Sequence, residues 1–172
     1  MGPISAILFD RDGTLIEDVP YNSDPAQVTP RENAAQAVRR VRARGIRTGV
    51  VTNQSGIARG LITREALQSV NERVDELLGP FDTWQVCPHG PEDGCGCRKP
   101  APGMIVAACA ELGVPPGEVV VIGDIESDMI AAAAAGAHAV LVPTPVTRDE
   151  EVGRAPIAAP DLGAAVDWVL DR

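Results

Sequence analysis

Short apolar runs alternate along this chain with segments of helical length, and this alternation limits the possible folds more than any other feature. Runs such as Ala6–Phe9 and Val119–Ile122 are apolar at every position, as expected for strands that are covered on both faces of a sheet. The segments between such runs, Arg64–Leu78 for example, are amphipathic and long enough for helices. Because parallel strands need crossover helices, the pattern predicts an α/β protein with a doubly wound parallel sheet and helices on both faces.

The expected elements follow one another in a regular order. Strands are predicted at Ala6–Phe9, Thr48–Thr52, Thr83–Val86, Val119–Ile122 and Ala139–Val142. Helices are predicted at Pro30–Arg44, Arg64–Leu78, Pro102–Leu112, Ser127–Ala135 and Leu162–Leu170. Thr29-Pro30-Arg31-Glu32 offers an N-cap, a first-turn proline and a capping-box glutamate for the first helix. Gly45 and Gly113 stand where helices are expected to end.

The chain length favours one domain over residues 1–172, because 172 residues can bury one substantial core. Aromatic residues are only 3% of the chain, so this core must consist of Ala, Val, Leu and Ile. No long insertion separates Leu15 from Arg31, or Thr52 from the third strand. We therefore expect no large cap domain, and an open active site whose loops provide specificity.

The formal charge of −9 argues against a general nucleic-acid or anionic-membrane binder, which would normally carry a basic face. The N-terminal segment lacks the basic region and long apolar stretch of a signal peptide. No apolar run is long enough to cross a bilayer. We expect a cytoplasmic, monomeric protein.

Polar side chains follow the predicted strands at the points where parallel sheets bind ligands. They are Asp10, Asp12, Thr52, Asn53, Lys99, Asp124 and Asp128. Converging carboxylates repel one another unless a cation neutralises them, and hard oxygen ligands suit Mg²⁺. Hydroxyl, amide and ammonium donors beside Mg²⁺ suit a phosphoryl group. The combination therefore indicates phosphoryl transfer, in which Asp10 could attack phosphorus and Asp12 could serve as general acid and base.

Each of these residues also has an ordinary structural explanation when taken singly. A pair of Asp residues after a strand is commonly turn chemistry or a helix cap, and a lone Lys is commonly solvated. A non-enzymatic, zinc-stabilised interaction domain is the alternative from another class of protein. That alternative predicts loss of the nucleophile or of the lysine, whereas Asp10, Asp12, Lys99 and Asp124 are all present.

Three of the four cysteines and one of the two histidines lie within one short segment, as C-x-H-x₅-C-x-C. These residues are Cys87, His89, Cys95 and Cys97. Three cysteines and one histidine are a standard ligand set for structural Zn²⁺. A disulfide is disfavoured by the expected compartment and would leave one thiol unpaired, and the redox spacing C-x-x-C is absent. We therefore expect a small zinc-stabilised loop at residues 87–97.

Several segments resemble the signature motifs of the haloacid-dehalogenase-like phosphohydrolases. The matching residues are Asp10-Arg11-Asp12-Gly13-Thr14, Thr52, Lys99 and Gly123-Asp124…Asp128. Further segments, "VTNQSGIARG" and "CPH…C-C-RKP-PGM", are similar to the heptose bisphosphate and histidinol-phosphate phosphatases within that superfamily. The resemblance covers nearly the whole chain and becomes weaker after about Val142.

The resemblance implies a Rossmann-like fold and a role for each motif residue. Asp10 would be the nucleophile and Asp12 the general acid and base, while Thr52 and Lys99 would hold the phosphoryl oxygens. Mg²⁺ would be bound by Asp10, Asp124 and the main-chain carbonyl of Asp12. The zinc site of the related phosphatases has a ligand order that maps onto the cysteine and histidine cluster.

The resemblance also implies a substrate, a small phosphorylated metabolite. The first expectation is removal of the 7-phosphate of D-glycero-D-manno-heptose 1,7-bisphosphate, with histidinol phosphate or another small metabolite as the alternative. Substrate contacts are expected from Asp18, Tyr21, Asn53, Gln54, Ser55, Arg59 and Arg98. Two features depart from the related enzymes: only five residues separate His89 from Cys95, and Ile125 stands where heptose bisphosphatases typically have Lys.

Overall fold

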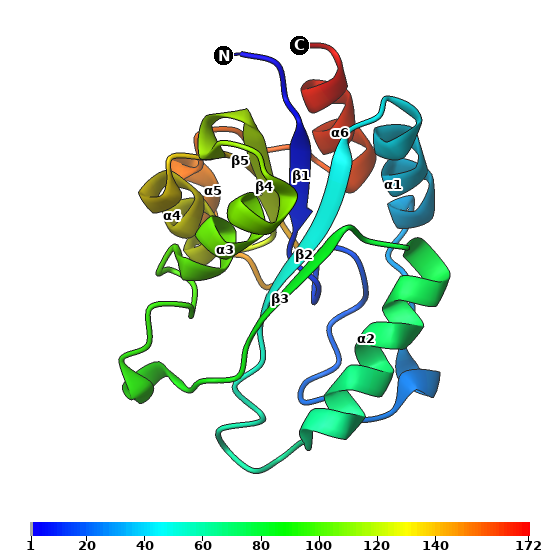
Figure 1. Cartoon of the computed structure of the whole chain (residues 1–172), viewed down its shortest axis with the longest axis vertical. Helices are drawn as coiled ribbons and strands as arrows, with labels where there is room; N and C mark the ends of the chain where they lie inside the picture. The colour runs from blue at the N-terminus through cyan, green and yellow to red at the C-terminus, as the bar shows by residue number, and fades with distance from the viewer. Residues whose placement is uncertain (1) are drawn as a thin grey trace.

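The computed structural model of the protein describes residues 2–172. Its centre is a five-stranded sheet in which every neighbouring pair is parallel, in the order β3-β2-β1-β4-β5 (Figure 1). The strands are β1 (Ala6–Phe9), β2 (Arg47–Asn53), β3 (Thr83–Cys87), β4 (Val119–Gly123) and β5 (His138–Leu141). All five strands predicted from the sequence are present, with ends that differ by at most one residue.

Helices cover both faces of this sheet. They are α1 (Ala34–Ala43), α2 (Arg64–Leu78), α3 (Gly103–Leu112), α4 (Glu126–Ala135), α5 (Asp149–Arg154) and α6 (Leu162–Leu170), and the short 3₁₀ turns are η1 (Pro25–Gln27), η2 (Pro91–Asp93) and η3 (Pro116–Glu118). Helices α1, α2 and α6 lie on one side of the sheet, and α3, α4 and α5 lie on the other (Figure 1). The doubly wound fold expected from the sequence is therefore confirmed.

Alternate residues of β1 supply the two cores. Ile7 and Phe9 pack into a cluster with residues of α1, α2 and α6, whereas Ala6 and Leu8 pack into a cluster with residues of α3 and α4. All four side chains are fully buried. This is the arrangement that a continuously apolar strand predicts, because successive side chains point to opposite faces.

The start of the first helix differs from the sequence-based prediction. Pro30 forms an antiparallel bridge with Ile16, and the amide of Glu17 donates to the carbonyl of Thr29 at 2.9 Å. The segment expected to cap the helix is thus extended, and α1 begins only after Asn33, whose φ is +65°. Pairing with the loop after β1 outweighs the local capping signal.

The other differences are smaller. Helix α5 was not expected, because Asp149–Arg154 carries no apolar stripe and contains Gly153. Helices α2 and α6 have the predicted bounds, and Gly45 and Gly113 take the left-handed conformation that helix ends require. Within residues 2–172, no helix combines the length and the hydropathy that crossing a bilayer would take.

The strand order places the functional loops. The connections run in opposite directions on either side of the β1–β4 pair, and open α/β sheets bind ligands outside the carboxyl ends of strands at such a point. The amide of Asp10 donates to the carbonyl of Ile122 at 2.9 Å, which continues this pair beyond the last residue of β1. Within the described chain, the segments from β1 to α1 and from β2 to α2 contain one 3₁₀ turn, η1, and no strand or α-helix that could form a cap.

Candidate active site

A pocket of about 340 Å³ opens at the carboxyl ends of β1, β2 and β4. Ten residues predicted for the site line it: Asp10, Asp12, Asp18, Tyr21, Thr52, Asn53, Gln54, Ser55, Lys99 and Asp124. The 18–21 segment contributes one wall and the loop after β2 another. Side chains from four separate parts of the sequence are thereby brought into one cavity.

Lys99 lies at the floor of this pocket between two carboxylates. Its Nζ donates to Oδ1 of Asp10 at 2.6 Å and to the carbonyl oxygen of Val51 at 2.9 Å. Its Nζ also lies 2.6 Å from Oδ1 of Asp128. Lys99 is 4% exposed and Asp128 fully buried. A buried ammonium needs such partners, because burial of an unpaired charge is costly.

The electrostatics of the pocket show an excess of buried negative charge. Burial, opposed by Lys99 and reinforced by Asp128 and Asp124, raises the pKa of Asp10 well above its ordinary value. Burial and then repulsion by Asp128 raise the pKa of Asp124 to about 7. Burial alone would lower the pKa of Lys99, but the carboxylates of Asp10 and Asp128 raise it above its ordinary value.

The carboxylates of Asp10, Asp124 and Asp128 place one oxygen each within 4.8 Å of one another. The ammonium of Lys99 offsets one of these charges, so a cation of charge two would neutralise the rest. Carboxylate oxygens of this kind, few in number and beside an open pocket, fit Mg²⁺. The cluster therefore supports a magnesium site that includes Asp10 and Asp124.

Two glycines allow the acidic side chains to approach this closely. A Cβ on Gly13, which has φ of +83°, would lie 2.4 Å from Oδ2 of Asp124. A Cβ on Gly123 would lie 2.3 Å from Cγ of Asp128. The glycine in each motif is thus required by a neighbouring carboxylate, and at Gly13 by the left-handed backbone as well.

Asp12 is held apart from the other carboxylates. Its Oδ2 accepts a hydrogen bond of 2.8 Å from Nε2 of Gln54, which also donates to Oγ1 of Thr52 at 2.9 Å. Nε and Nη2 of Arg11 donate to both carboxylate oxygens at 3.0 to 3.2 Å. Asp12 therefore faces the pocket with a fixed orientation.

Asn53 fixes the backbone from which Lys99 projects. Its side-chain amide donates to the carbonyl of Lys99 at 3.1 Å and accepts from the Lys99 amide at 3.0 Å. This two-point contact joins the end of β2 to the segment before α3. Asn53, predicted as a substrate contact, thus positions the lysine while its side chain lines the pocket.

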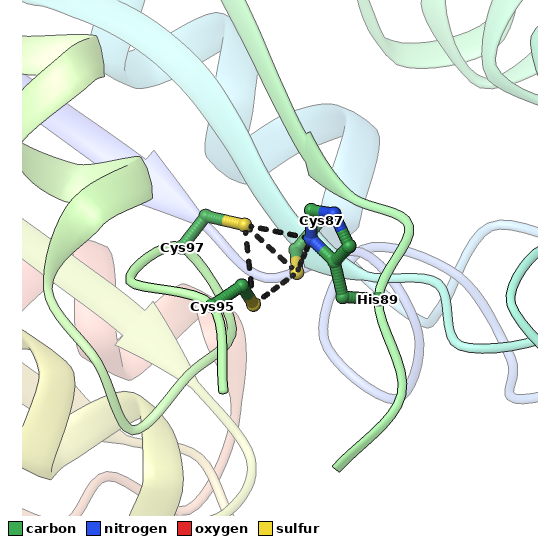
Figure 2. A group of neighbouring side chains, drawn as sticks. All are labelled: Cys87, His89, Cys95 and Cys97. Atoms are coloured by element: carbon green, nitrogen blue, oxygen red, sulfur yellow. Dashed lines mark hydrogen bonds between the residues drawn. The ribbon is translucent and has the colours of Figure 1, made fainter. Parts of the chain in front are cut away.

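The three cysteines and the histidine converge, as Figure 2 shows. The sulfur atoms of Cys87, Cys95 and Cys97 are 3.1, 3.5 and 3.7 Å apart, and Nδ1 of His89 lies 3.2 and 3.6 Å from two of them. Tetrahedral Zn²⁺ with Zn–S bonds of about 2.3 Å would separate its sulfur ligands by roughly 3.8 Å. A disulfide would need about 2.05 Å, and all three cysteines are free. The cluster therefore fits zinc.

The cysteine loop is tied directly to the residues that follow it. The amide of Gly103, at the start of α3, donates to the carbonyl of Gly96 at 3.0 Å, and a Cβ on Gly103 would lie 2.3 Å from that oxygen. Nη1 of Arg98 donates to the carbonyl of His89 at 3.2 Å. Closing the loop around a metal would therefore also fix the segment that carries Arg98 and Lys99.

Two predicted substrate residues do not line the central pocket. Arg98 lines a neighbouring pocket of about 270 Å³, which Lys99 also lines. Arg59 is exposed, and its guanidinium carbon lies 5.8 Å from the centre of the Tyr21 ring. Both cations are therefore at the margin of the site rather than at its floor.

Sequence reasoning missed the roles of two residues. Asp128 was noted as part of a motif, but the structure makes it a direct partner of Lys99. Arg11 was likewise noted only as part of a motif, but it is 2% exposed and its guanidinium pairs with Asp12. The burial of the Arg11 side chain could not be deduced from the position of this residue in a loop.

Comparisons with known proteins agree with this geometry. A family model described as "HAD-hyrolase-like" matches residues 96–168. The chain is 36% identical over 145 residues to a D-glycero-beta-D-manno-heptose-1,7-bisphosphate 7-phosphatase of Pseudomonas aeruginosa, a match that covers 81% of this chain and 82% of that protein. The identity to the Yersinia pestis protein of the same name is also 36%, over 98% of this chain and 90% of that one.

The chain belongs to the haloacid-dehalogenase-like hydrolases.

A solved structure extends the likeness to three dimensions. It is the D,D-heptose 1,7-bisphosphate phosphatase of B. bronchiseptica, complexed with magnesium and phosphate. It superimposes with a TM-score of 0.86 at 29% identity and covers 98% of this chain and 99% of that one. The family and the Rossmann-like fold predicted from the sequence are confirmed, and this haloacid-dehalogenase-like chain is an enzyme of the phosphatase class.

Removing one thiol from the cysteine cluster of this phosphatase should lower its stability and its activity together. We expect Cys95→Ser to lose bound zinc and to unfold at a lower temperature, because metal binding in such a site contributes to folding free energy. Metal content by atomic emission and thermal unfolding by circular dichroism measure both effects.

Cys109→Ala is the matched control, since Cys109 is buried in the core beside α3 and lies outside the cluster. That variant should keep its zinc. Unchanged zinc content and an unchanged Tm in Cys95→Ser would contradict the zinc assignment.

Proposed function

We propose that residues 1–172 act as one Mg²⁺-dependent phosphatase domain that removes the 7-phosphate of D-glycero-D-manno-heptose 1,7-bisphosphate. The observation that carries this proposal is the placement of Lys99, which lines two adjoining pockets. One pocket holds Asp10, Asp12 and Asp124, and the other holds Arg98. Two anionic groups of one small molecule could therefore be bound on either side of Lys99.

In the first step, a carboxylate oxygen of Asp10 attacks phosphorus and the bond from phosphorus to the sugar oxygen breaks. The departing oxygen takes a proton from Asp12, so the products of this step are the sugar alcohol and an aspartyl-phosphate. The hydrogen bond from Lys99 to Oδ1 of Asp10 at 2.6 Å holds the nucleophile in one orientation. Lys99 and Thr52 donate to the phosphoryl oxygens.

In the second step, water attacks the phosphorus of the aspartyl-phosphate and Asp12 takes its proton. The bond from phosphorus to Asp10 breaks, inorganic phosphate leaves, and both aspartates return to their starting states. The contacts of Asp12 with Gln54 and Arg11 support this second role, because they keep the carboxylate directed into the pocket.

Magnesium would be held by Asp10, Asp124 and the main-chain carbonyl of Asp12. When bound, it would neutralise charge on the transferring phosphoryl group. Burial first, and then the neighbouring carboxylates, raise the pKa values of Asp10 and Asp124, and a bound cation would favour the charged forms of both groups.

The heptose bisphosphate is favoured over histidinol phosphate by the charges around the two pockets. Arg98 offers a guanidinium to a second phosphate, and its planar fork suits such an anion. The acidic residues that could attract a cationic substrate, Glu92 and Asp93, are exposed on η2. Oδ2 of Asp93 already accepts from the amide of Gly90 at 2.7 Å. Tyr21, Asn53, Gln54 and Ser55 would contact the sugar.

A comparison of kcat/KM for the two substrates tests the proposal. In the presence of Mg²⁺ we expect heptose 1,7-bisphosphate to be hydrolysed with a higher kcat/KM than histidinol phosphate. Arg98→Ala should lower the ratio of the two kcat/KM values, chiefly by raising KM for the bisphosphate. A higher kcat/KM for histidinol phosphate would reject the substrate, and absence of Mg²⁺-dependent turnover of either would reject the enzyme.

Asp12→Asn should lower turnover of the sugar phosphate on the order of 10²-fold or more, as expected for loss of a general acid and base. Steady-state kinetics of the purified variant measure this loss. Asn keeps the size of the side chain but offers one acceptor oxygen where Arg11 and Gln54 donate to two. Thermal unfolding is therefore measured as well, and the kinetics are compared below the Tm of the variant. A rate close to that of the wild type would contradict the role of Asp12.

The proposal includes a monomeric enzyme in the cytoplasm. All residues assigned to the pocket come from one chain, so no second copy is needed to complete it. The free thiols of the cysteine cluster suit a reducing compartment.

A further inference from the structure

Arg11 is buried more completely than its place in a loop would suggest. Its side chain is 2% exposed, and its guanidinium makes contacts on two sides. On one side, Nε and Nη2 face both oxygens of Asp12 at 3.0 to 3.2 Å. On the other side, Nη1 donates to Oδ1 of Asn71 on α2 at 2.6 Å. The guanidinium therefore links a helix to the acid/base residue of the site.

The contact between Arg11 and Asp12 orients the Asp12 carboxylate as well as balancing its charge. A guanidinium that meets both oxygens of a carboxylate sets the plane of that carboxylate. Gln54 adds a third donor on Oδ2 at 2.8 Å. The side chain of Arg11 is long, so it keeps this geometry only if its guanidinium is itself fixed in place. The hydrogen bond of 2.6 Å from Nη1 to Oδ1 of Asn71 fixes it.

Asn71 lies outside the pocket in which the chemistry is proposed. It lines a separate groove of about 690 Å³ between α2 and β3, together with residues such as Gln68 and Trp84. It is absent from the residues that line the central pocket within the described chain. A substitution at Asn71 therefore replaces no residue that lines the central pocket.

We infer that Asn71 is a positioning residue, which acts through Arg11 to orient Asp12 for proton transfer. This inference rests on the proposed role of Asp12 as general acid and base. Asn71 touches neither substrate nor metal, so its contribution should appear only in steps that need a proton from Asp12 or to Asp12. A small displacement of a catalytic group is enough to lower the rate of such a step markedly.

The dependence on the leaving group separates this role from a merely structural one. The value of kcat/KM reports the steps up to formation of the aspartyl-phosphate. A primary alkyl phosphate needs a proton on its departing oxygen in that step, whereas para-nitrophenyl phosphate releases nitrophenolate, a stabilised anion that needs no proton. Loss of orientation at Asp12 should therefore lower kcat/KM for the alkyl substrate much more than for the aryl substrate.

The test uses the full-length enzyme with Mg²⁺ and two substitutions of similar size. Asn71→Leu removes the acceptor, and Asn71→Asp restores an oxygen acceptor for Arg11. The substrates are para-nitrophenyl phosphate and whichever of heptose bisphosphate and histidinol phosphate the wild type hydrolyses faster. Gln68→Ala is the matched control, because Gln68 is exposed on the same helix and groove. Within residues 2–172 its side chain hydrogen-bonds only to Glu72, at 2.8 Å.

For Asn71→Leu we expect kcat/KM to fall on the order of 10-fold for the alkyl phosphate and less than about 3-fold for the aryl phosphate. Asn71→Asp should retain most of the wild-type kcat/KM for the alkyl phosphate, and Gln68→Ala should have the wild-type kcat/KM for both substrates. An equal fall with both substrates, no fall with either, or no rescue by Asn71→Asp would overturn the inference.

Failure of the inference and failure of the proposed function give different results. The proposed function fails if the wild type shows no Mg²⁺-dependent turnover. It also fails if Asp12→Asn lowers kcat/KM for the alkyl substrate no more than for the aryl substrate. If Asp12→Asn shows the selective loss and Asn71→Leu does not, the proposed function stands and the positioning role of Asn71 is rejected.

Discussion

Asp10→Asn is expected to abolish phosphatase activity while the protein remains folded. The substitution removes the oxygen that would attack phosphorus, and no other carboxylate is placed to replace it without giving up a different role. Asp12 is held by Arg11 and Gln54, and Asp128 is paired with Lys99. Hydrolysis of an aryl phosphate with and without Mg²⁺ measures the loss.

The stability of the same variant gives an independent check on the electrostatics. Burial and the neighbouring carboxylates raise the pKa of Asp10, so its charged form is disfavoured in the folded protein at neutral pH. A neutral Asn removes that charge and can still accept from Lys99. In buffer without Mg²⁺, Tm should be equal to that of the wild type or higher. A variant that retains turnover, or that loses activity because it unfolds, would contradict the assignment of Asp10.

Lys99→Met should lower both activity and stability. Loss of one donor to a phosphoryl group commonly costs on the order of 10²- to 10³-fold in kcat. Removal of the ammonium also leaves Asp10 and the fully buried Asp128 without their shared partner. Breaking a buried ion pair in this way costs about 3–5 kcal/mol. Urea unfolding in buffer without Mg²⁺ measures the loss of stability, and steady-state kinetics measure the loss of activity.

A double-mutant cycle distinguishes loss of this pairing from loss of packing. If Asp128 is destabilising once Lys99 is gone, Asp128→Asn in the Lys99→Met background should recover part of the free energy of unfolding. The same substitution in the wild type should destabilise it, because there it weakens an existing pair. Additive effects of the two substitutions would show that the contact between Lys99 and Asp128 does not contribute.

The sheet and the members of the site were accessible from the sequence because they depend on local patterns. The continuous apolar runs of β1 and β4 predicted strands covered on both faces, and both are fully buried. The polar residues just after those strands then had to share one edge, which is why Asp10, Asp12 and Asp124 were found together. The spacing of the cysteines likewise predicted their convergence.

What escaped prediction depends on contacts between distant segments. The start of α1 was wrong because Pro30 pairs with Ile16 across a loop, which no capping signal indicates. The partnership of Lys99 with Asp128 joins the loop before α3 to α4. The inward turn of Arg11 depends on Asn71, sixty positions further along the chain. Sequence patterns report which face of an element is buried, but not which polar side chains meet there.

The most direct test of the account is a search for the phosphoryl group on Asp10. Asp12→Asn treated with para-nitrophenyl phosphate and Mg²⁺ should form the aspartyl-phosphate without help from an acid and hydrolyse it slowly for lack of a base. Rapid acid quench, digestion and mass spectrometry should then find the phosphoryl group on the peptide that carries Asp10, at that residue. Release of nitrophenol with no phosphoryl group on Asp10, or with the group on another residue, would contradict the account.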